Sequence, residues 1–290
     1  MLLHTYKNTL RILFRSIVFV SIIVLVFLNV LFFMSQTQFG HYNGTRIVGD
    51  KEPSFVLIEH IYRKLTFNAL HNSVMIYAVP LLCVFSVVIV QKNDFNAGLF
   101  EVEKASGAKP SRHLFGRISA IITIDFIVAT LASYLSVWWY CGTRGGVEGW
   151  SIWQLLSDSG IRVIRIVLIC ELPAILLCVT LTYMIGALFK SAFASGTVGT
   201  TFVITFFALN LFFRSVFQTT FAYKWLNYLW WDPYTTLNYF DTSYANEEII
   251  NGQTHVPASW SEITIWVGIM IGFAVVFTTV SYFLTRKRSV

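Results

Sequence analysis

The chain has 290 residues, of which 56% are hydrophobic, 17% aromatic and only 12% charged, and its mean hydropathy is +0.64. Charged residues make up about a quarter of a soluble globular domain, so this composition excludes that class and indicates a membrane protein. The formal net charge of +6 is explained by the topology argued below. A nucleic-acid partner would need a soluble basic face, which the sequence lacks, so we expect none.

Residues 1–15 predict an amphipathic helix. Two sets of residues recur on its opposite sides at helical spacing, a basic set of His4, Lys7, Arg11 and Arg15 and an apolar set of Leu3, Tyr6, Leu10 and Leu13. One interpretation is a helix that lies in the inner membrane interface, with its bases toward anionic lipid headgroups. The alternative is a simple continuation of the first span into the cytosol.

Apolar runs of about 20 residues, the length that crosses a hydrocarbon core as a helix, occur at 16–34, 73–90, 118–140, 166–189, 192–213 and 262–284. The first run is longer than the apolar region of a signal peptide, so we interpret it as an uncleaved span. With the N-terminus inside, Lys and Arg are densest in the inner segments, which predicts that both termini are cytoplasmic. We therefore expect an all-α, multi-pass protein of a bacterial cell membrane, with six spans in one transmembrane domain, 1–290.

The most charged segment lies between the second and third spans, at 93–110. If it is helical, Phe95, Leu99 and Val102 share one apolar face. Glu101 and Lys104 lie off that face at a spacing that allows them to pair. The pattern predicts a short amphipathic helix along the inner membrane surface, and its apolar face needs a partner.

This loop and the start of the third span resemble the first cytoplasmic loop of ABC-2-type transporter permeases. The matching residues are Glu101, Glu103, Gly107, Pro110, Ser111, Arg112, Gly116 and Arg117. In that family the loop is the coupling helix, which docks into a groove of the ATP-binding subunit. The resemblance implies a docking set of Phe95, Leu99, Glu101, Val102, Glu103, Lys104, Pro110 and Arg112. The same loop also resembles that of FtsX/MacB-type permeases, but the interval 35–72 is too short for the large ectodomain of that class.

Polar and small residues within the later spans suggest internal contacts. Asp125, Glu171 and Asn210 lie in the third, fourth and fifth spans, where they either line a translocation path or form interhelical hydrogen bonds. Gly268 and Gly272 form a G-x-x-x-G motif in the sixth span, which predicts helix packing within the chain or between two chains.

The segment 214–261 is aromatic, as expected at the outer membrane interface. The resemblance implies a re-entrant hairpin here, over 217–231. The alternative is an interfacial helix that caps the bundle.

The resemblance implies the membrane subunit of an ABC exporter. The phosphate-binding pattern G-x-x-x-x-G-K-[ST] does not occur in the sequence, so we expect no enzyme activity and no cofactor in this chain, with ATP and Mg²⁺ bound by a cytoplasmic ATPase partner. A second permease copy, identical or homologous, and membrane lipid are the other expected partners. A hydrophobic or amphipathic peptide, of the antimicrobial or cytolytic kind, or a lipid-like molecule would suit as cargo. The alternative is a non-transporting sensor, or an assembly or immunity component, that recruits a cytoplasmic partner.

The predicted topology can be tested by labelling single cysteines in intact cells and in inverted vesicles. A cysteine at Lys109 should react only from the cytoplasmic side, because the loop is inside. A cysteine at Gln253 should react only from outside. Opposite labelling of either position would contradict the six-span arrangement.

Overall fold

The computed structural model describes residues 2–36, 78–96, 110–144, 172–216, 248–250, 253–255 and 260–288. This part of the chain forms seven helices, α1 Leu2–Arg15, α2 Ile17–Gln36, α4 Ala78–Asn96, α6 Pro110–Arg144, α8 Leu172–Phe189, α9 Ala192–Val216 and α12 Trp260–Arg288. The strands β1 Glu248–Ile250 and β2 Gln253–His255 pair antiparallel, with Ile249 opposite Thr254. Apart from this short hairpin, the regular structure that is described is helical, as the composition predicts.

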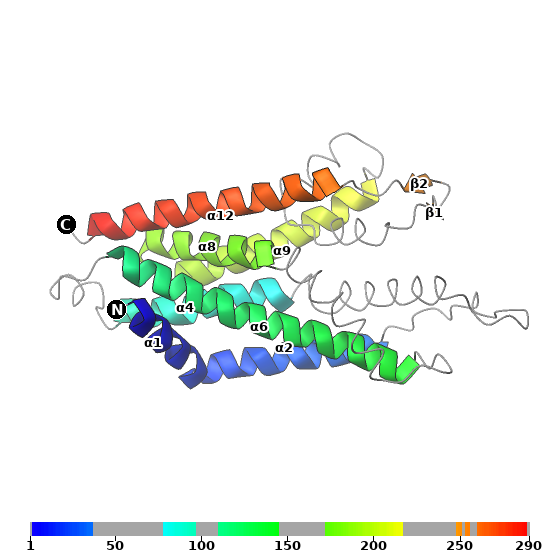
Figure 1. Ribbon diagram of the computed structural model, residues 1–290, viewed down its shortest axis with the longest axis horizontal. Helices are drawn as coiled ribbons and strands as arrows, with labels where there is room; N and C mark the ends of the chain where they lie inside the picture. The colour runs from blue at the N-terminus through cyan, green and yellow to red at the C-terminus, as the bar shows by residue number, and fades with distance from the viewer. Residues whose placement is uncertain are drawn as a thin grey trace, which may run out of the picture.

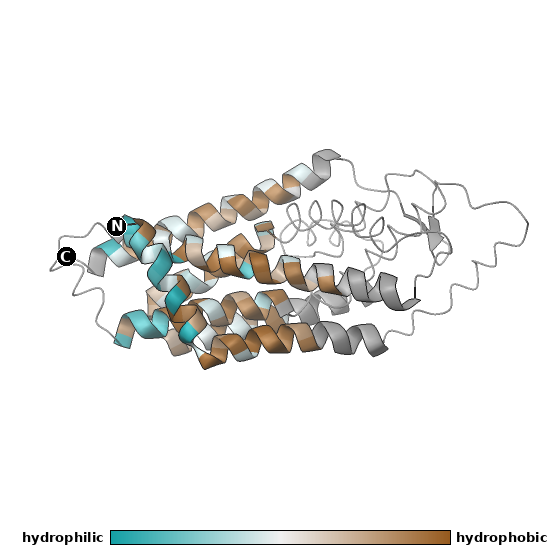
Figure 2. Ribbon diagram, turned by 60° about the horizontal axis from the view of Figure 1, so that its bottom comes forward, coloured by the Kyte–Doolittle hydropathy of each residue, from teal (hydrophilic) through white to brown (hydrophobic). Residues whose placement is uncertain are grey.

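The helices form an elongated bundle with both chain termini at the same end (Figure 1). Hydrophilic residues gather toward that end, and hydrophobic residues dominate the middle of the bundle (Figure 2). Among the described residues, three segments are long and apolar enough to cross a membrane, namely Ser111–Ala132, Leu172–Phe189 and Val267–Arg286, and a fourth is counted if the bent pair α1 and α2 forms one span. This architecture fits an α-helical membrane protein, while the count of six spans stays a prediction.

Helix α1 turns sharply away from α2. The two helices are bent by 72° at Ser16, where the sequence predicts the first span to begin. The hydroxyl of Ser16 accepts a hydrogen bond from the backbone amide of Phe19 at 3.4 Å, so it caps the N-terminus of α2. Because of this bend, α1 does not continue the first span in a straight line.

The charged segment 93–110 is helical at both of its ends. Residues 93–96 complete α4, so Phe95 belongs to that helix, and the rest of the predicted loop helix lies outside the described residues. Helix α6 begins at Pro110, about two turns before the predicted start of the third span at Ile118. A proline suits the first helical position, since its missing amide hydrogen has no partner there in any helix.

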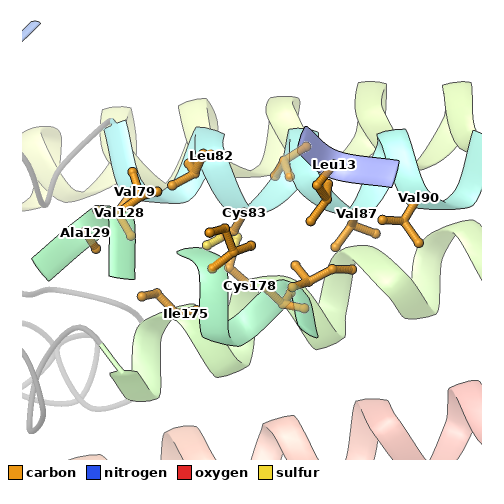
Figure 3. Close-up of a cluster of buried hydrophobic side chains, with 14 of the residues drawn as sticks. Leu13, Val79, Leu82, Cys83, Val87, Val90, Val128, Ala129, Ile175 and Cys178 are labelled. Atoms are coloured by element: carbon orange, nitrogen blue, oxygen red, sulfur yellow. The ribbon is translucent and has the colours of Figure 1, made fainter. Parts of the chain in front are cut away.

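Helix α8 is central to the bundle and α12 is peripheral. Within the apolar window of each helix, 67% of the residues are buried in α8 and 17% in α12. The main core cluster joins α4, α6 and α8, where Cys83, Val87, Ile175 and Cys178 lie together, and Leu13 of α1 also enters it (Figure 3). Helix α12 packs on α8 through a smaller cluster that includes Leu177 and Met270.

A buried glutamine joins α4 to both α8 and α9. Gln91 Nε2 donates to the carbonyl of Tyr183 at 2.9 Å, and Ser195 Oγ donates to Gln91 Oε1 at 2.8 Å. Gly186 makes room for this side chain, because a Cβ atom there would lie 1.9 Å from Gln91 Oε1. Lys190, with a φ of 55°, ends α8 in the left-handed conformation that often closes a helix.

We expect Gly186→Ala to destabilise the bundle by displacing Gln91 from its two buried hydrogen bonds, each of which contributes about 1 kcal/mol. Gly272→Ala is the matched control, since a Cβ atom there meets nothing within 4 Å among the described residues. Any gain in helix propensity is common to both variants and cancels. The free energy of unfolding in detergent should therefore be about 2 kcal/mol lower for Gly186→Ala. Equal stability of the two variants would contradict this packing.

Candidate functional site

A network of buried polar side chains centres on Arg117, near the N-terminus of α6. Its guanidinium donates from Nη2 to Asp94 Oδ1, from Nη1 to Thr9 Oγ1 at 3.0 Å and from Nε to His113 Nε2 at 3.1 Å. Thr9 Oγ1 in turn donates to the carbonyl of Thr5 at 2.8 Å. Each of the three guanidinium nitrogens is thus used in a hydrogen bond, and the partners come from three helices.

The ion pair at the centre of this network is removed from solvent. The side chains of Asp94 and Arg117 are each 1% exposed. Burying two charges costs several kcal/mol per ion, and close pairing with further hydrogen bonds is needed to offset that cost. Each nitrogen of the Arg117 guanidinium donates one hydrogen bond, whereas Asp94 Oδ2 has no hydrogen-bond partner among the described residues, and His113 Nε2 lies 3.7 Å from it. Loss of either side chain would therefore leave the charge of the other one buried and unpaired.

The close approach of α1 to α6 depends on a glycine. A Cβ atom on Gly116 would lie 2.9 Å from Thr5 Cβ and 3.2 Å from the carbonyl oxygen of Leu2. The absent side chain lets α1 lie directly on α6, which brings Thr9 within reach of Arg117. The network therefore ties α1 to the last turn of α4, at Asp94, and to the first turns of α6, the two helix ends that flank 97–109.

The predicted docking residues are only partly within the described structure. Phe95 is half-buried at the end of α4, Arg112 is exposed on α6, and Pro110 is the first residue of α6. The remaining members lie outside the described residues, namely Leu99, Glu101, Val102, Glu103 and Lys104. The docking face itself therefore stays a prediction, while the two helices that hold its ends are defined.

Asp125 is fully buried within the bundle. It accepts a hydrogen bond from Ser86 Oγ at 2.7 Å, which links α6 to α4, and the thiol of Cys83 lies beside it. Asp125 thus forms one interhelical hydrogen bond, while its Oδ2 has no hydrogen-bond partner among the described residues, so a place on a translocation path stays a prediction for it. Glu171 and the side chain of Asn210 lie outside the described residues, so the choice between path and packing stays open for them.

Gly268 and Gly272 lie on an exposed part of α12. A Cβ atom at either position would meet nothing within 4 Å, so the G-x-x-x-G motif has no packing partner among the described helices. Packing within the chain and packing against a second chain therefore both stay predictions for this motif.

The sequence analysis did not single out the residues that complete the polar contacts, Thr9, Ser86, Gln91, Asp94 and Ser195. One signal was available, because Asp94 lies about one turn after the apolar run that ends at Val90, close to Lys92. In the sequence this pattern indicates only a charged loop. Among the described residues, no group of three His, Cys, Asp or Glu side chains is placed to hold a metal ion.

Comparisons with known proteins leave the family open, since no family model matches the chain and no curated protein matches its sequence. The resemblance carried by residues 93–117 therefore stays a prediction.

We expect Arg117→Met to lower the free energy of unfolding by about 3–5 kcal/mol, because it leaves Asp94 buried without its counter-charge. Arg112→Met removes an exposed charge from the same helix and should change stability by no more than about 0.5 kcal/mol. Adding Asp94→Leu to Arg117→Met should restore part of the loss, since it removes the unpaired charge. Equal stability of Arg112→Met and Arg117→Met, measured by denaturation in detergent, would show that the ion pair contributes nothing.

Proposed function

We propose that this chain is the membrane subunit of an ABC exporter, in which a separate cytoplasmic ATPase supplies the energy. The observation that carries the proposal is the buried attachment of α4 to α6 on either side of 97–109. A docking loop can move a membrane bundle only if its two ends are firmly held, and the Asp94–Arg117 pair supplies that hold. The resemblance of the loop to a coupling helix implies that its partner is the ATP-binding subunit of such a transporter.

In this proposal the six predicted spans cross a bacterial cell membrane, with both termini in the cytoplasm. Exposed cations at the end of the bundle that carries the termini support this orientation, namely Lys7, Arg11, Arg15, Lys92, Arg112, Lys190 and Arg286. An excess of Lys and Arg marks the cytoplasmic side of membrane proteins.

Motion of the docking loop has a physical route into the bundle. When the ATPase subunits close, the loop draws the inner ends of α4 and α6 together with α1, because Arg117 bonds to both Asp94 and Thr9. From α4 the motion reaches α8 and α9 through Gln91, which bonds to both. Discrete, hydrogen-bonded contacts of this kind transmit a displacement because packed helices move as units.

Close packing of α9 on α4 strengthens this route. A Cβ atom on Gly196 would lie 3.2 Å from Val88 Cγ2, and one on Gly199 would lie 3.1 Å from Val84 Cγ1. Small residues of this kind let two membrane helices approach closely, and the attraction between their surfaces then holds them. Helix α9 therefore follows α4 along two turns of contact rather than at one hydrogen bond.

A second permease copy completes the proposed transporter. The exposed face of α12 around Gly268 and Gly272 is one surface on which such a copy can pack. The cargo of the proposed exporter is a hydrophobic or amphipathic peptide, or a lipid-like molecule, which suits a bundle with few charges in its interior.

Leu99→Asp should separate the ATPase from the membrane subunit without preventing membrane insertion. It puts a charge on the apolar face of the proposed coupling helix, and truncating a buried anchor of an interface costs about 1 kcal/mol or more. Lys104→Ala is the control, because a charge at the rim of an interface contributes little affinity. The measurements are co-purification of an ATPase and substrate-stimulated ATP hydrolysis. If Leu99→Asp keeps both at the wild-type level, the docking proposal is wrong.

A further inference from the structure

Helix α1 has three sides with different chemistry. Successive residues are about 100° apart around a helix, so Thr5, Thr9 and Leu13 share one side. This side packs on α6 and α4, and both Thr9 and Leu13 are fully buried. The other two sides face away from the bundle.

The second side of α1 is apolar but exposed. Leu3 and Phe14 are 62% and 55% exposed, while Leu10, on the same side, is partly buried against the main core cluster. This strip leads directly into the exposed start of α2, where Ile17 is 83% exposed and Val18 is 56% exposed. An apolar strip that continues the lipid-facing surface of a spanning helix suits the boundary between headgroups and acyl chains.

The third side of α1 is basic. His4, Lys7, Arg11 and Arg15 follow one another at helical spacing, and all four are exposed. Asp94, the acidic side chain described at this end of the bundle, is buried and paired with Arg117, so it does not neutralise them. Cations beside an apolar strip match anionic lipid headgroups in both charge and depth.

We infer that α1 binds anionic lipid of the inner leaflet and that this contact is coupled, through Thr9 and Arg117, to the inner ends of α4 and α6. Thr9 lies on the opposite side of α1 from Lys7 and Arg11, so one side of the helix contacts headgroups while the other holds Arg117. A change in the depth or tilt of α1 then displaces Arg117, and Arg117 holds Asp94.

The consequence is a regulatory input that is separate from ATP. The charge of the leaflet sets the position of the two helix ends that flank 97–109. This inference goes beyond the proposed transport function and does not require an ATPase, so the chain alone is sufficient to test it. If the ATPase partner does not exist, the lipid contact and its coupling are unaffected.

Lipid selectivity is the first measurement. The full chain is purified in detergent, and the retention of phosphatidylglycerol relative to phosphatidylcholine is measured by native mass spectrometry. The wild type should prefer phosphatidylglycerol. In the variant with Lys7→Gln and Arg11→Gln, the ratio of retained phosphatidylglycerol to phosphatidylcholine should fall about five-fold for each charge removed.

The control variant carries Lys190→Gln and Arg286→Gln, which remove the same charge from elements other than α1. It should keep the preference. An equal loss in both variants would show that the lipid responds to net charge rather than to α1, and would overturn the inference. So would a wild type without any preference, which would leave an acidic protein as the partner of this face.

Coupling is the second measurement. The chain is placed in nanodiscs of phosphatidylcholine alone, or of equal parts phosphatidylcholine and phosphatidylglycerol, and amide hydrogen exchange is followed at 92–96 and 110–117. Exchange in the wild type should be slower with phosphatidylglycerol. Polyphosphate added to the phosphatidylcholine discs should not slow it, and slowing there would identify free phosphate rather than lipid as the ligand, against the inference.

Thr9→Val separates binding from coupling, because it keeps the shape of the side chain and removes the hydroxyl that bonds Arg117. This variant should keep the preference for phosphatidylglycerol but lose the lipid-dependent slowing of exchange, and Thr9→Ser should restore the slowing. Lipid-dependent slowing that persists in Thr9→Val would overturn the coupling.

Discussion

The arrangement of the end of the bundle that carries both termini depends on one buried ion pair, between Asp94 and Arg117. Two charges that are each 1% exposed would be unfavourable if either stood alone, so the helices that carry them are held in a single relative position. The remaining donors of Arg117 bind Thr9 and His113, which extends this constraint to α1. Three helices from separate parts of the chain therefore meet at one guanidinium, and none of them can shift alone without leaving a buried charge or donor unsatisfied.

Packing away from this pair follows a different rule. In a membrane, burial of apolar surface does not drive helices together, because lipid is as apolar as the side chains, so close contact and hydrogen bonds must do so. The structure shows both kinds of contact between α4 and its neighbours. Gly186 makes room for Gln91, which bonds to α8 and to Ser195 of α9, while Ser86 bonds to Asp125 of α6. Helix α4 is thus joined to α6, α8 and α9 by at least one buried polar contact each.

The ion pair and the hydrogen bonds of α4 determine which helices are joined directly to one another. Helix α6 is attached to α4 by the Asp94–Arg117 ion pair, and α1 is attached to α6 by the hydrogen bond between Arg117 and Thr9. Helices α8 and α9 are attached to α4 by the amide of Gln91. Helix α12 packs mainly on α8 through apolar side chains, and most of its span is exposed. A displacement at the end that carries the termini can therefore reach the rest of the bundle through α4, and also through the direct packing of α6 on α8 and α12.

The sequence by itself determined the features that arise within one stretch of chain. Long apolar runs identify helices, and basic residues at helical spacing identify α1 as amphipathic. Only the tertiary structure decided which polar groups meet. Arg117 and Thr9 are 108 residues apart, and Gln91 and Ser195 are 104 apart. A helix that is apolar on every side has no periodicity to indicate which face contacts which neighbour. The sequence is therefore equally compatible with Asp94 or Gln91 in a loop, at the lipid headgroups or in the core. The tertiary structure buries Asp94 and Gln91. Burial of such a polar residue is favourable only where a partner of opposite charge or matching hydrogen-bonding capacity lies within reach.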